Sequence, residues 1–480
     1  MTTLLANRQG QTLKNHTKSV LLMVEQVWFK LYGTKTPEAL RFGALLHDTG
    51  KAIKSFQDNL NTVKTKQKGV YEGLYHEEIS LVMVLKYLSS IGVSESDIDI
   101  IAHLVYNHHA NAVGKDFERF RPEYKNIIET LTEEDENSVV EFIRNELGLD
   151  ISSNNKEQGE IPNYHPIFSD FKHDNIKQLD RLSTHCLKDF YLSILIDCDR
   201  KISSLEKEVV ETIANGDTEI FKTNSVLVDY FDKLLRNPFG GSNVVFPEKY
   251  DIKRLERQTM VAESSTAVTT SIINEPAGGG KTLISLLYAI KLKRRVVLIL
   301  PRNNPAKSLF EDVVETLKDL GFGHISVELF LGGERKDSVN ANEEILSSDV
   351  IITNIHNVLN SLTKNDIADR RLFFYTSTMI FDEYHELMQD NAISSLFYRL
   401  ILSRHLYSNS KSMMLSATPE VIPSLIEVFD DKNLKYFPEK FKHYENFNKN
   451  PIQVKMLSDF PEQLEPGSCC LTNSVSEANA

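Results

Sequence analysis

Histidines and aspartates recur along the first 200 residues in a combination that suits metal binding. The set consists of His16, His47, Asp48, His76, His108, His109, Asp197 and Asp199. Imidazole nitrogens and carboxylate oxygens together form mixed sites for first-row transition metals. Two such metals about 3.5–4 Å apart can clamp the attacking and leaving oxygens of a phosphate ester. If these residues converge, they would form a hydrolytic site for phosphate esters.

A different phosphate site is indicated in the second half by the stretch EPAGGGKT. Its candidate ATP-binding residues are Gly278, Gly279, Gly280, Lys281 and Thr282. Glycines allow backbone N–H groups and a helix N-terminus to face phosphates, the lysine adds positive charge, and the threonine hydroxyl can bind Mg²⁺. Glu275 stands where the strict phosphate-loop pattern has its first glycine. The stretch therefore fits the variant in which Ala or Pro precedes G-x-G-K-T.

An acidic pair that would complete the nucleotide site lies in MIFDEYHEL. Asp382 and Glu383 end an apolar stretch, and ligands of open parallel sheets bind at the carboxyl ends of strands. Asp382 would hold Mg²⁺, and Glu383 would orient and activate the attacking water. Further on, Ser416 and Thr418 in LSATPE could couple the nucleotide state to a DNA track, or they could only cap a strand-to-helix turn.

The histidine-rich half needs helices to bring its side chains together. Apolar residues recur at three and four spacing in SVLLMVEQVWFKLY, EEISLVMVLKYLSSI and DFYLSILIDCDRKISSL, which is the period of a helix with one buried face. We therefore predict an all-α domain over residues 1–235, whose helix ends would deliver imidazoles and carboxylates into one cage. Within it, the polar, lysine-rich stretch 54–69 is predicted to be an exposed loop.

After a Pro- and Gly-containing linker at residues 236–250, the pattern changes to short apolar stretches that alternate with helical ones. The stretches are TTSIINEP, RRVVLILP, HISVELF, DVIITN, TMIFDE and KSMMLSAT. Strands that are apolar on both faces and separated by helices are typical of a parallel sheet covered on both sides. The sequence thus predicts a multidomain protein, with an α/β domain over residues 251–445 following the all-α domain.

Composition excludes several classes of protein. At 480 residues, with 41% hydrophobic and 25% charged residues, the chain suits two or three globular domains and is not largely disordered. It has no apolar run of about 18 residues and no signal-peptide pattern, so we expect a cytoplasmic protein without a membrane partner. Its four cysteines lack C-x-x-C spacing, which argues against a structural zinc site. A net charge of −13 argues against coating duplex DNA through bulk charge but permits a local basic groove.

With GGGKT, DEYH and SAT in this order, the second half resembles a superfamily-two helicase of the DExH type. The resemblance implies ATP with Mg²⁺ as the cofactor. It also places Gln258 as an adenine-reading residue, although a solvent-facing position on a helix would fit the same glutamine. Loops after two strands would contact the phosphate backbone of single-stranded DNA. The residues so placed are Pro301, Arg302, Thr353 and Asn354.

A helicase of this type also needs a second RecA-like domain, which supplies an arginine finger for ATP hydrolysis. Residues 446–480 resemble only the start of that domain. We therefore expect the helicase half of this chain to be incomplete and its ATP hydrolysis to be poor.

The ordered series H, HD with a lysine three residues after the aspartate, H, HH and D resembles the HD phosphohydrolase superfamily. Followed by helicase motifs, it resembles the CRISPR-associated helicase-nuclease of type I systems. The resemblance implies one metal held by His16, His47, Asp48 and Asp199, and a second held by His76, His108 and His109 with Asp48 as a bridge. Imidazole-rich ligation favours Mn, Fe, Co or Ni over Mg.

Two further residues of the first half are assigned by this resemblance. Lys51 would lie near the scissile phosphate and stabilise developing charge. Asp199 is preferred over Asp197 as the last ligand, because the final aspartate of the family usually follows a small residue and precedes a basic or aromatic one.

The function that the resemblance implies is that of a type I CRISPR interference effector. Such a protein is a metal-dependent nuclease for single-stranded DNA joined to an ATP-dependent DNA helicase, and it is recruited to an RNA-guided surveillance complex. The catalytic residues would be His47, Asp48, Lys51 and Glu383. Two alternatives stay open: an HD nucleotide phosphohydrolase fused to an ATP-sensing domain, and a hydrolysis-deficient fragment that binds ATP and DNA.

Overall fold

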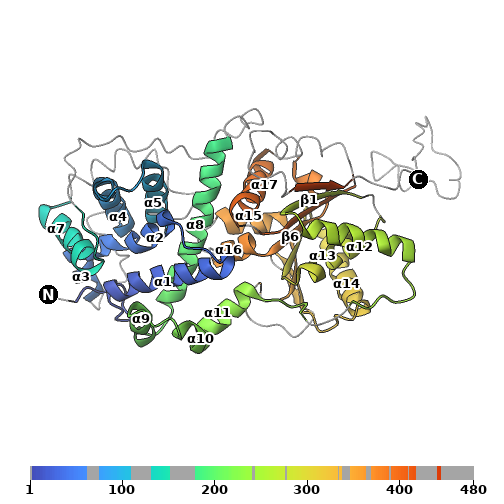
Figure 1. Cartoon of the computed structure of the whole chain (residues 1–480), viewed down its shortest axis with the longest axis horizontal. Helices are drawn as coiled ribbons and strands as arrows, with labels where there is room; N and C mark the ends of the chain where they lie inside the picture. Colours follow the sequence, from blue (N-terminus) through green and yellow to red (C-terminus); the bar gives the residue numbers. More distant parts are fainter. Residues whose placement is uncertain are drawn as a thin grey trace. The chain divides into compact units, whose positions relative to one another are not determined.

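A computed structural model shows a helical half followed by a half built on a β-sheet (Figure 1). It describes residues 3–61, 75–109, 131–151, 179–240, 244–275, 278–332, 334–337, 346, 348–363, 369–388, 391–408, 410–417 and 441–444. Every described residue belongs to one compact unit. Thr418 and the region 446–480 lie outside the described residues, so the predictions made for them stay predictions.

The first half is all-α as predicted: apart from an isolated β-bridge between Leu5 and Thr12, its regular elements in the described residues are helices. Its helices are α1 (Leu13–Tyr32), α2 (Glu38–Leu46), η1 (Thr49–Ala52), α3 (Lys54–Asn61), α4 (His76–Tyr87), η2 (Leu88–Ile91), α5 (Glu95–Asn107), α7 (Glu133–Glu141), η3 (Phe142–Glu146), α8 (Leu179–Ser203), α9 (Lys207–Ala214), α10 (Ile220–Thr223) and α11 (Ser225–Leu235). Among these helices and the others that the structure describes, none has the length and apolarity needed to cross a bilayer.

Local sequence signals explain where α1 begins and ends. The Thr12 side chain accepts a hydrogen bond from the backbone N–H of Asn15, which caps the first turn. Gly33 ends the helix in the left-handed region at φ 66°, and its N–H donates to Phe29. Between these ends, α1 buries an apolar face at helical spacing, so tertiary packing adds to the capping.

One prediction for the first half is wrong. The stretch predicted to be a loop over 54–69 begins with helix α3, which covers residues 54–61, whereas residues 62–69 lie outside the described residues. The Gln57 side chain accepts a hydrogen bond from the Leu5 N–H at 2.8 Å and donates to the Lys51 carbonyl at 2.7 Å. These contacts tie a polar helix to the rest of the half, and such contacts are invisible to hydrophobic periodicity.

The second half is an eight-stranded sheet in the order β4-β3-β5-β2-β6-β7-β1-β8. The strands are β1 (Thr270–Asn274), β2 (Val296–Leu300), β3 (Val327–Leu331), β4 (Glu334–Asp337), β5 (Val350–Asn354), β6 (Thr378–Phe381), β7 (Ser412–Ser416) and β8 (Phe441–Tyr444). Only β4 is antiparallel to its neighbour. The six predicted strands are confirmed as β1, β2, β3, β5, β6 and β7, whereas β8, which extends the sheet beside β1, was not predicted.

Helices cover both faces of this sheet. They are α12 (Ile252–Thr266), α13 (Lys281–Leu292), α14 (Asn304–Asp319), α15 (Ile355–Thr363), α16 (Asp369–Thr376), η6 (Tyr384–Met388), α17 (Asn391–Ser403) and η7 (Arg404–Ser408). Alternate residues of β2 enter two different cores: Leu298 packs with α12, α13 and α14, whereas Val297 packs with α15, α16 and α17. This two-sided burial is the reason that the strands read as continuous apolar runs.

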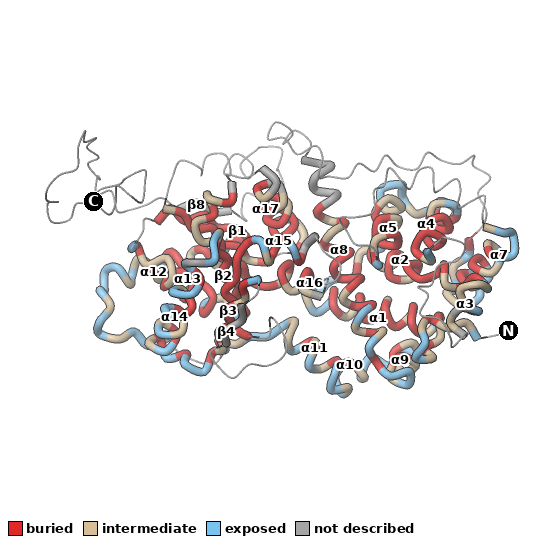
Figure 2. The backbone as a smooth tube through the Cα atoms, turned by 180° about the vertical axis from the view of Figure 1, so that it is seen from behind, coloured by how far each residue is buried: buried red, intermediate tan, exposed pale blue. Residues whose placement is uncertain are grey.

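The helical half and the sheet share one of these two cores. Helix α8 packs against α16 and α17, and the buried positions continue from the helices of the first half into the sheet (Figure 2). The ring of Phe190 on α8 meets that of Tyr375 on α16 edge-on at 5.6 Å, and Asp189 forms an ion pair with Arg399 of α17. The predicted linker at 236–250 therefore connects two halves that also join through a buried apolar surface.

Candidate metal centre and nucleotide site

The structure brings the metal-ligand candidates of the first half together from five helices. His16 lies in α1, His47 and Asp48 directly follow α2, His76 begins α4, His108 and His109 follow α5, and Asp199 lies near the end of α8. They form two groups, in each of which the potential ligand atoms lie within 4.8 Å of one another. One group is His16, His47, Asp48 and Asp199, and the other is Asp48, His76, His108 and His109.

Asp48 belongs to both groups because its two carboxylate oxygens face different histidines. Its Oδ2 lies 3.4 Å from Nε2 of His16 and 3.5 Å from Nε2 of His47. Its Oδ1 lies 3.3 Å from Nε2 of His76 and 3.4 Å from Nε2 of His108. The side chain is fully buried. This is the arrangement expected of a carboxylate that bridges two metal ions.

Asp199 completes the first group, and His109 completes the second. Oδ1 of Asp199 lies 3.0 Å from Nε2 of His16 and 3.6 Å from Nε2 of His47. The ring of His109 lies 4.2 Å from that of His108, and His109 is the exposed member of the second group. The first group is therefore closed, whereas the second opens toward solvent on the side of His109.

Hydrogen bonds fix which nitrogen of each imidazole faces the centre. Nδ1 of His47 lies 2.8 Å from the carbonyl oxygen of Ala44, and Nδ1 of His108 lies 2.6 Å from that of Val105. Because a carbonyl oxygen only accepts, the proton must sit on Nδ1, which leaves the lone pair of Nε2 directed at the carboxylates. Metal-binding histidines are oriented in this way.

Most potential metal-ligand atoms at the centre form no hydrogen bond within the described part of the chain. Nε2 of His16, His47, His76 and His108 and Oδ1 of Asp48 are buried without a hydrogen-bond partner there. Buried polar atoms are normally satisfied. An inward-facing set of imidazole lone pairs and carboxylate oxygens fits divalent cations.

Electrostatics favour positive charge at this centre. Burial alone would raise the pKa of Asp48, but the Lys51 ammonium at 2.6 Å and His47 hold it well below its usual value. Burial likewise opposes ionisation of Asp199, and the neighbouring imidazoles of His16 and His47 lower its pKa well below normal. Burial would lower the pKa of His47, but Asp48 and Asp199 raise it. The two carboxylates are thus ionised and attract either a proton or a metal.

The structure also separates the two aspartates of α8. Asp199 faces the histidines, whereas Asp197 accepts a hydrogen bond from the Tyr230 hydroxyl on α11. Of the two, Asp199, which the sequence pattern favoured as a ligand, is therefore the one that lies among the histidines. Asp197 instead ties α8 to α11.

Two supporting residues were not identified from the sequence. The Gln11 side-chain oxygen lies 3.2 Å from Nδ1 of His16, and Gly50 lets η1 pack closely on α4. A Cβ atom on Gly50 would lie 2.1 Å from the carbonyl oxygen of His76, so only glycine fits between the His47–Asp48 pair and the next ligand. The Gly50 N–H donates to the Ser80 hydroxyl at 2.7 Å, which fixes the contact.

The phosphate loop of the second half has the backbone that its glycines predicted. Gly278 and Gly280 have φ of 74° and 87°, and Gly280 caps the N-terminus of α13. Both values lie in the left-handed region, which glycine enters without strain. The Lys281 side chain extends from the first residue of α13 to the acidic pair after β6, where its Nζ contacts Glu383 and lies 3.5 Å from Asp382.

A cavity of about 490 Å³ adjoins this loop, with Tyr250, Gln258, Gly280 and Thr282 in its lining. Gln258 is only 3% exposed, and its Nε2 donates to the carbonyl oxygen of Gly279 at 3.0 Å. It therefore does not face bulk solvent, which was one interpretation of the sequence. Tyr250 was not singled out from the sequence, and it adds an aromatic ring to a cavity of nucleotide size.

Strand β7 contacts the acidic pair through its C-terminal end. The N–H of Ala417 donates to Oε2 of Glu383 at 3.1 Å, and the Ser416 hydroxyl lies 2.9 Å from Nδ1 of His385. Glu383 itself has φ of 47°, an uncommon value for a residue with a side chain. The backbone of Ala417 thus contacts the acidic pair directly, whereas the Ser416 side chain contacts His385.

The four candidate DNA-contact residues are placed differently from one another. Pro301 and Arg302 follow β2, and the Arg302 side chain is 71% exposed with its Nε 2.7 Å from Glu386. Asn354 at the end of β5 donates to the Asn303 side chain at 2.5 Å, so the two loops adjoin. Thr353 is fully buried and donates to the carbonyl oxygen of Phe330. In this structure, its side chain therefore supports the sheet and is not presented to a ligand.

Comparisons with known proteins agree with this two-part organisation. The HD domain family matches residues 13–144, and the DEAD/DEAH box helicase family matches residues 256–424. Comparison with curated proteins finds no match.

Comparison with solved structures shows a related fold in one protein. The crystal structure of T. fusca Cas3-AMPPNP has a TM-score of 0.50 and 15% identity, over 94% of this chain and 53% of that chain. A second, the crystal structure of a CRISPR-associated protein, has a TM-score of 0.45 and 14% identity, over 87% of this chain and 52% of that one. The chain thus spans about half the length of the solved structures it matches. The chain thus contains a region that matches the HD domain family, followed by a region that matches the DEAD/DEAH box helicase family, and it shares its fold with the T. fusca Cas3 structure.

Proposed function

We propose that the chain is a type I CRISPR interference effector that hydrolyses phosphodiester bonds of single-stranded DNA at a two-metal centre. The observation that carries this proposal is the pair of ligand groups that share Asp48. One group alone would suit many metalloproteins. Two groups joined by one carboxylate suit an in-line displacement at phosphorus, in which the attacking and the leaving oxygen each need a cation.

The residues of this chain would act as ligands and as a source of charge. His16, His47 and Asp199 would hold one cation and His76, His108 and His109 the other, with Asp48 between them. Bound divalent metals would polarise the phosphate and activate water. The Lys51 ammonium lies 2.6 Å from Oδ2 of Asp48, so it is close enough to the centre to stabilise negative charge that develops on the phosphate.

The second half would use ATP to move the strand. Lys281 and Thr282 would bind the phosphates and Mg²⁺, Asp382 would hold Mg²⁺, and Glu383 would orient water. Support comes from the direct contact between Lys281 and the acidic pair and from the adjoining cavity of about 490 Å³. Exposed Arg302 is the best-placed candidate for a sequence-independent contact with the DNA backbone.

Recruitment to an RNA-guided surveillance complex is the part of the proposal that rests on likeness to Cas3. The fold shared with the T. fusca protein supports it. A cytoplasmic location follows from the same proposal, because such a complex acts on DNA inside the cell.

Cleavage of circular single-stranded DNA with Mn²⁺, with and without a chelator, tests the nuclease. Wild-type protein should cut the circle only when metal is present. Asp48→Asn should lose cleavage because it weakens both ligand groups, whereas Asp217→Asn, on the exposed turn after α9, should cut normally. Release of phosphate from free nucleotides without DNA cleavage would instead favour a nucleotide phosphohydrolase and would refute the proposal.

A further inference from the structure

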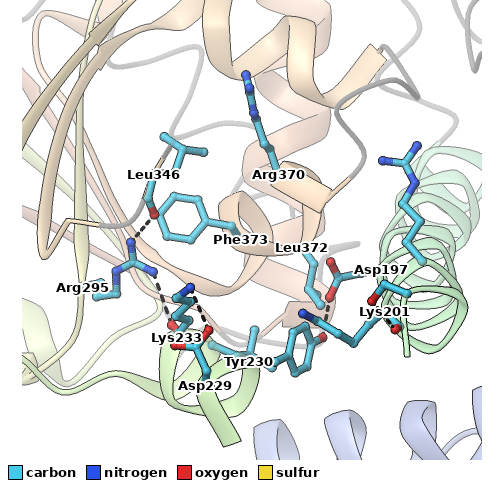
Figure 3. Close-up of a pocket in the computed structure, with 13 residues that line it drawn as sticks. Asp197, Lys201, Asp229, Tyr230, Lys233, Arg295, Leu346, Arg370, Leu372 and Phe373 are labelled. Carbon is cyan, nitrogen blue, oxygen red and sulfur yellow. Dashed lines mark hydrogen bonds and ion pairs between the residues drawn. The ribbon is translucent and has the colours of Figure 1, made fainter. Parts of the chain in front are cut away.

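Two adjoining cavities lie where helices of the first half meet the α/β half. The larger, of about 350 Å³, lies among α8, α11 and α16 (Figure 3). The smaller, of about 130 Å³, shares Lys233, Leu234, Arg295 and Phe373 with it. Because they have these lining residues in common, the two cavities form one groove, which we call the basic seam.

The basic seam is strongly cationic. The larger cavity is lined by Arg200, Lys201, Lys233, Arg295 and Arg370, and the smaller adds Lys30, Arg236 and Arg294. The acidic residues in the two linings are Asp197 and Asp229. Eight cations against two carboxylates stand out in a chain whose net charge is −13.

Both carboxylates already have partners inside the groove. Asp229 forms an ion pair with Lys233 at 2.9 Å, and Asp197 accepts the Tyr230 hydroxyl, as Figure 3 shows. In the smaller cavity, Arg236 pairs with Asp349 at 2.8 Å. Lys233 and Arg236 are therefore paired with carboxylates, and both aspartates of the two linings already have partners.

Other cations of the groove lie over aromatic rings. Lys201 lies over the ring of Tyr230 at 5.4 Å, and Arg370 lies over that of Phe330 at 5.3 Å. Within the described part of the chain, neither has a carboxylate partner within ion-pair distance. A cation over a ring face keeps its charge available to a ligand.

The walls between these charges are partly apolar. Leu234, Leu372 and Phe373 line the larger cavity, and the Arg295 guanidinium stacks over Phe373 at 4.7 Å. A cleft with charges of one sign and low-dielectric walls focuses its field and attracts ions of the opposite sign. The groove thus suits an anion that carries several charges along its length.

We propose that the basic seam binds consecutive phosphates of a single strand of nucleic acid. The cations are spread over two cavities in a row, which fits the repeated charge of a strand better than the one charge centre of a small anion. Helix α8 contributes to both sites. Asp199 is a ligand candidate of the metal centre, and the next two residues along the helix, Arg200 and Lys201, line the groove. The inference rests on the proposed function only in that the chain handles nucleic acid.

Binding of a fluorescein-labelled oligothymidine by the full chain, in chelator and without ATP, tests this proposal. Lys201→Gln/Arg370→Gln should weaken binding at least about fivefold, and the slope of log K against log salt should fall by about 1.4, the value for two lost phosphate contacts on a single strand. Lys207→Gln/Arg41→Gln is the control, because it removes the same charge from ion pairs outside the groove. Lys201→Arg/Arg370→Lys, which keeps the charge, should bind like the wild type.

Unchanged affinity and salt slope in the Gln double variant would overturn the proposal. The proposal would also be overturned if the Gln double variant lost binding of pyrophosphate but bound oligothymidine like the wild type. That result would indicate a site for a small anion. The outcome is separable from the proposed nuclease, because binding is measured in chelator, where metal-dependent cleavage does not occur. Weakened binding in a protein that never cuts DNA would support the basic seam and refute the nuclease.

Discussion

Gln11 and His16 are joined by a hydrogen bond whose direction is fixed by the surroundings of the glutamine. The Gln11 Nε2 donates to the carbonyl oxygens of Ile202 and Leu205, at 3.2 and 2.8 Å. Its Oε1 therefore faces Nδ1 of His16 at 3.2 Å and accepts a hydrogen bond from the Nδ1–H of that ring. Ile202 at the C-terminal end of α8 and Leu205 just after it thus set, through the Gln11 amide, which nitrogen of His16 is free for a metal.

Gln11→Leu should weaken binding of metal to the group that contains His16. Loss of such an outer partner typically lowers metal affinity about 10–100-fold, and titration calorimetry with Mn²⁺ would measure it. Ser19→Ala is a matched control on α1, because it removes a buried hydrogen bond to the Val210 carbonyl without touching an imidazole. Equal Mn²⁺ affinity in Gln11→Leu and Ser19→Ala would contradict the role assigned to Gln11.

Asp199→Asn and Asp197→Asn should differ in metal content. Asp199 supplies an oxygen to one ligand group, so its amide variant should retain about half of the wild-type metal per chain under dialysis against Mn²⁺, as expected if one of two sites is lost. Asp197→Asn should retain all of it, because Asp197 contacts Tyr230 instead. Elemental analysis of the dialysed proteins decides the matter, and a reversed pattern would assign the ligand to Asp197.

Gly50→Ala should destabilise the first half. The new Cβ would lie 2.1 Å from a backbone carbonyl, which cannot rotate away as a side chain could. Overpacking of this kind costs about 1–3 kcal/mol, which chemical denaturation would reveal. Gly323→Ala is the control, since its nearest neighbour would be 3.8 Å away and its φ is not positive. A stable Gly50→Ala protein would show that η1 and α4 can separate without loss.

Lys281→Ala should abolish detectable ATP binding. Its ammonium is the main positive charge between the phosphate loop and the acidic pair, so removing it leaves Asp382 and Glu383 to repel the phosphates. Binding of a fluorescent ATP analogue would measure the loss. Lys291, on the same helix, forms an ion pair with exposed Glu263. The control variant Lys291→Ala should therefore bind the ATP analogue like the wild type. Wild-type affinity in Lys281→Ala would place the nucleotide elsewhere.

The parts of the fold that the sequence predicted are those whose signals are local. Strand β2 is apolar at every position and β5 at its first three, because both faces of these strands are buried. The HD pair and the phosphate loop carry their chemistry in adjacent residues, so their types alone point to metal and phosphate.

The parts that escaped prediction depend on partners far away in the sequence. Helix α3 is polar and is held by contacts between Gln57 and Leu5. Gln11 acts through carbonyls about 190 residues away, at separations of 191 and 194. Strand β8 exists as a partner of β1, across 171 residues from Thr270 to Phe441. The burial of Thr353 also depends on a distant partner, because its hydroxyl donates to the carbonyl oxygen of Phe330 on β3.

The apolar surface between α8 and the pair α16 and α17 has a practical consequence for dissecting the molecule. Cutting the chain at residues 236–250 would leave Phe190 and Cys186 on one piece and Tyr375 and Leu400 on the other without their cover. Each piece would then expose an apolar surface to water, and we expect it to self-associate. The two activities are better assigned by point substitution in the intact polypeptide than by expressing its halves separately.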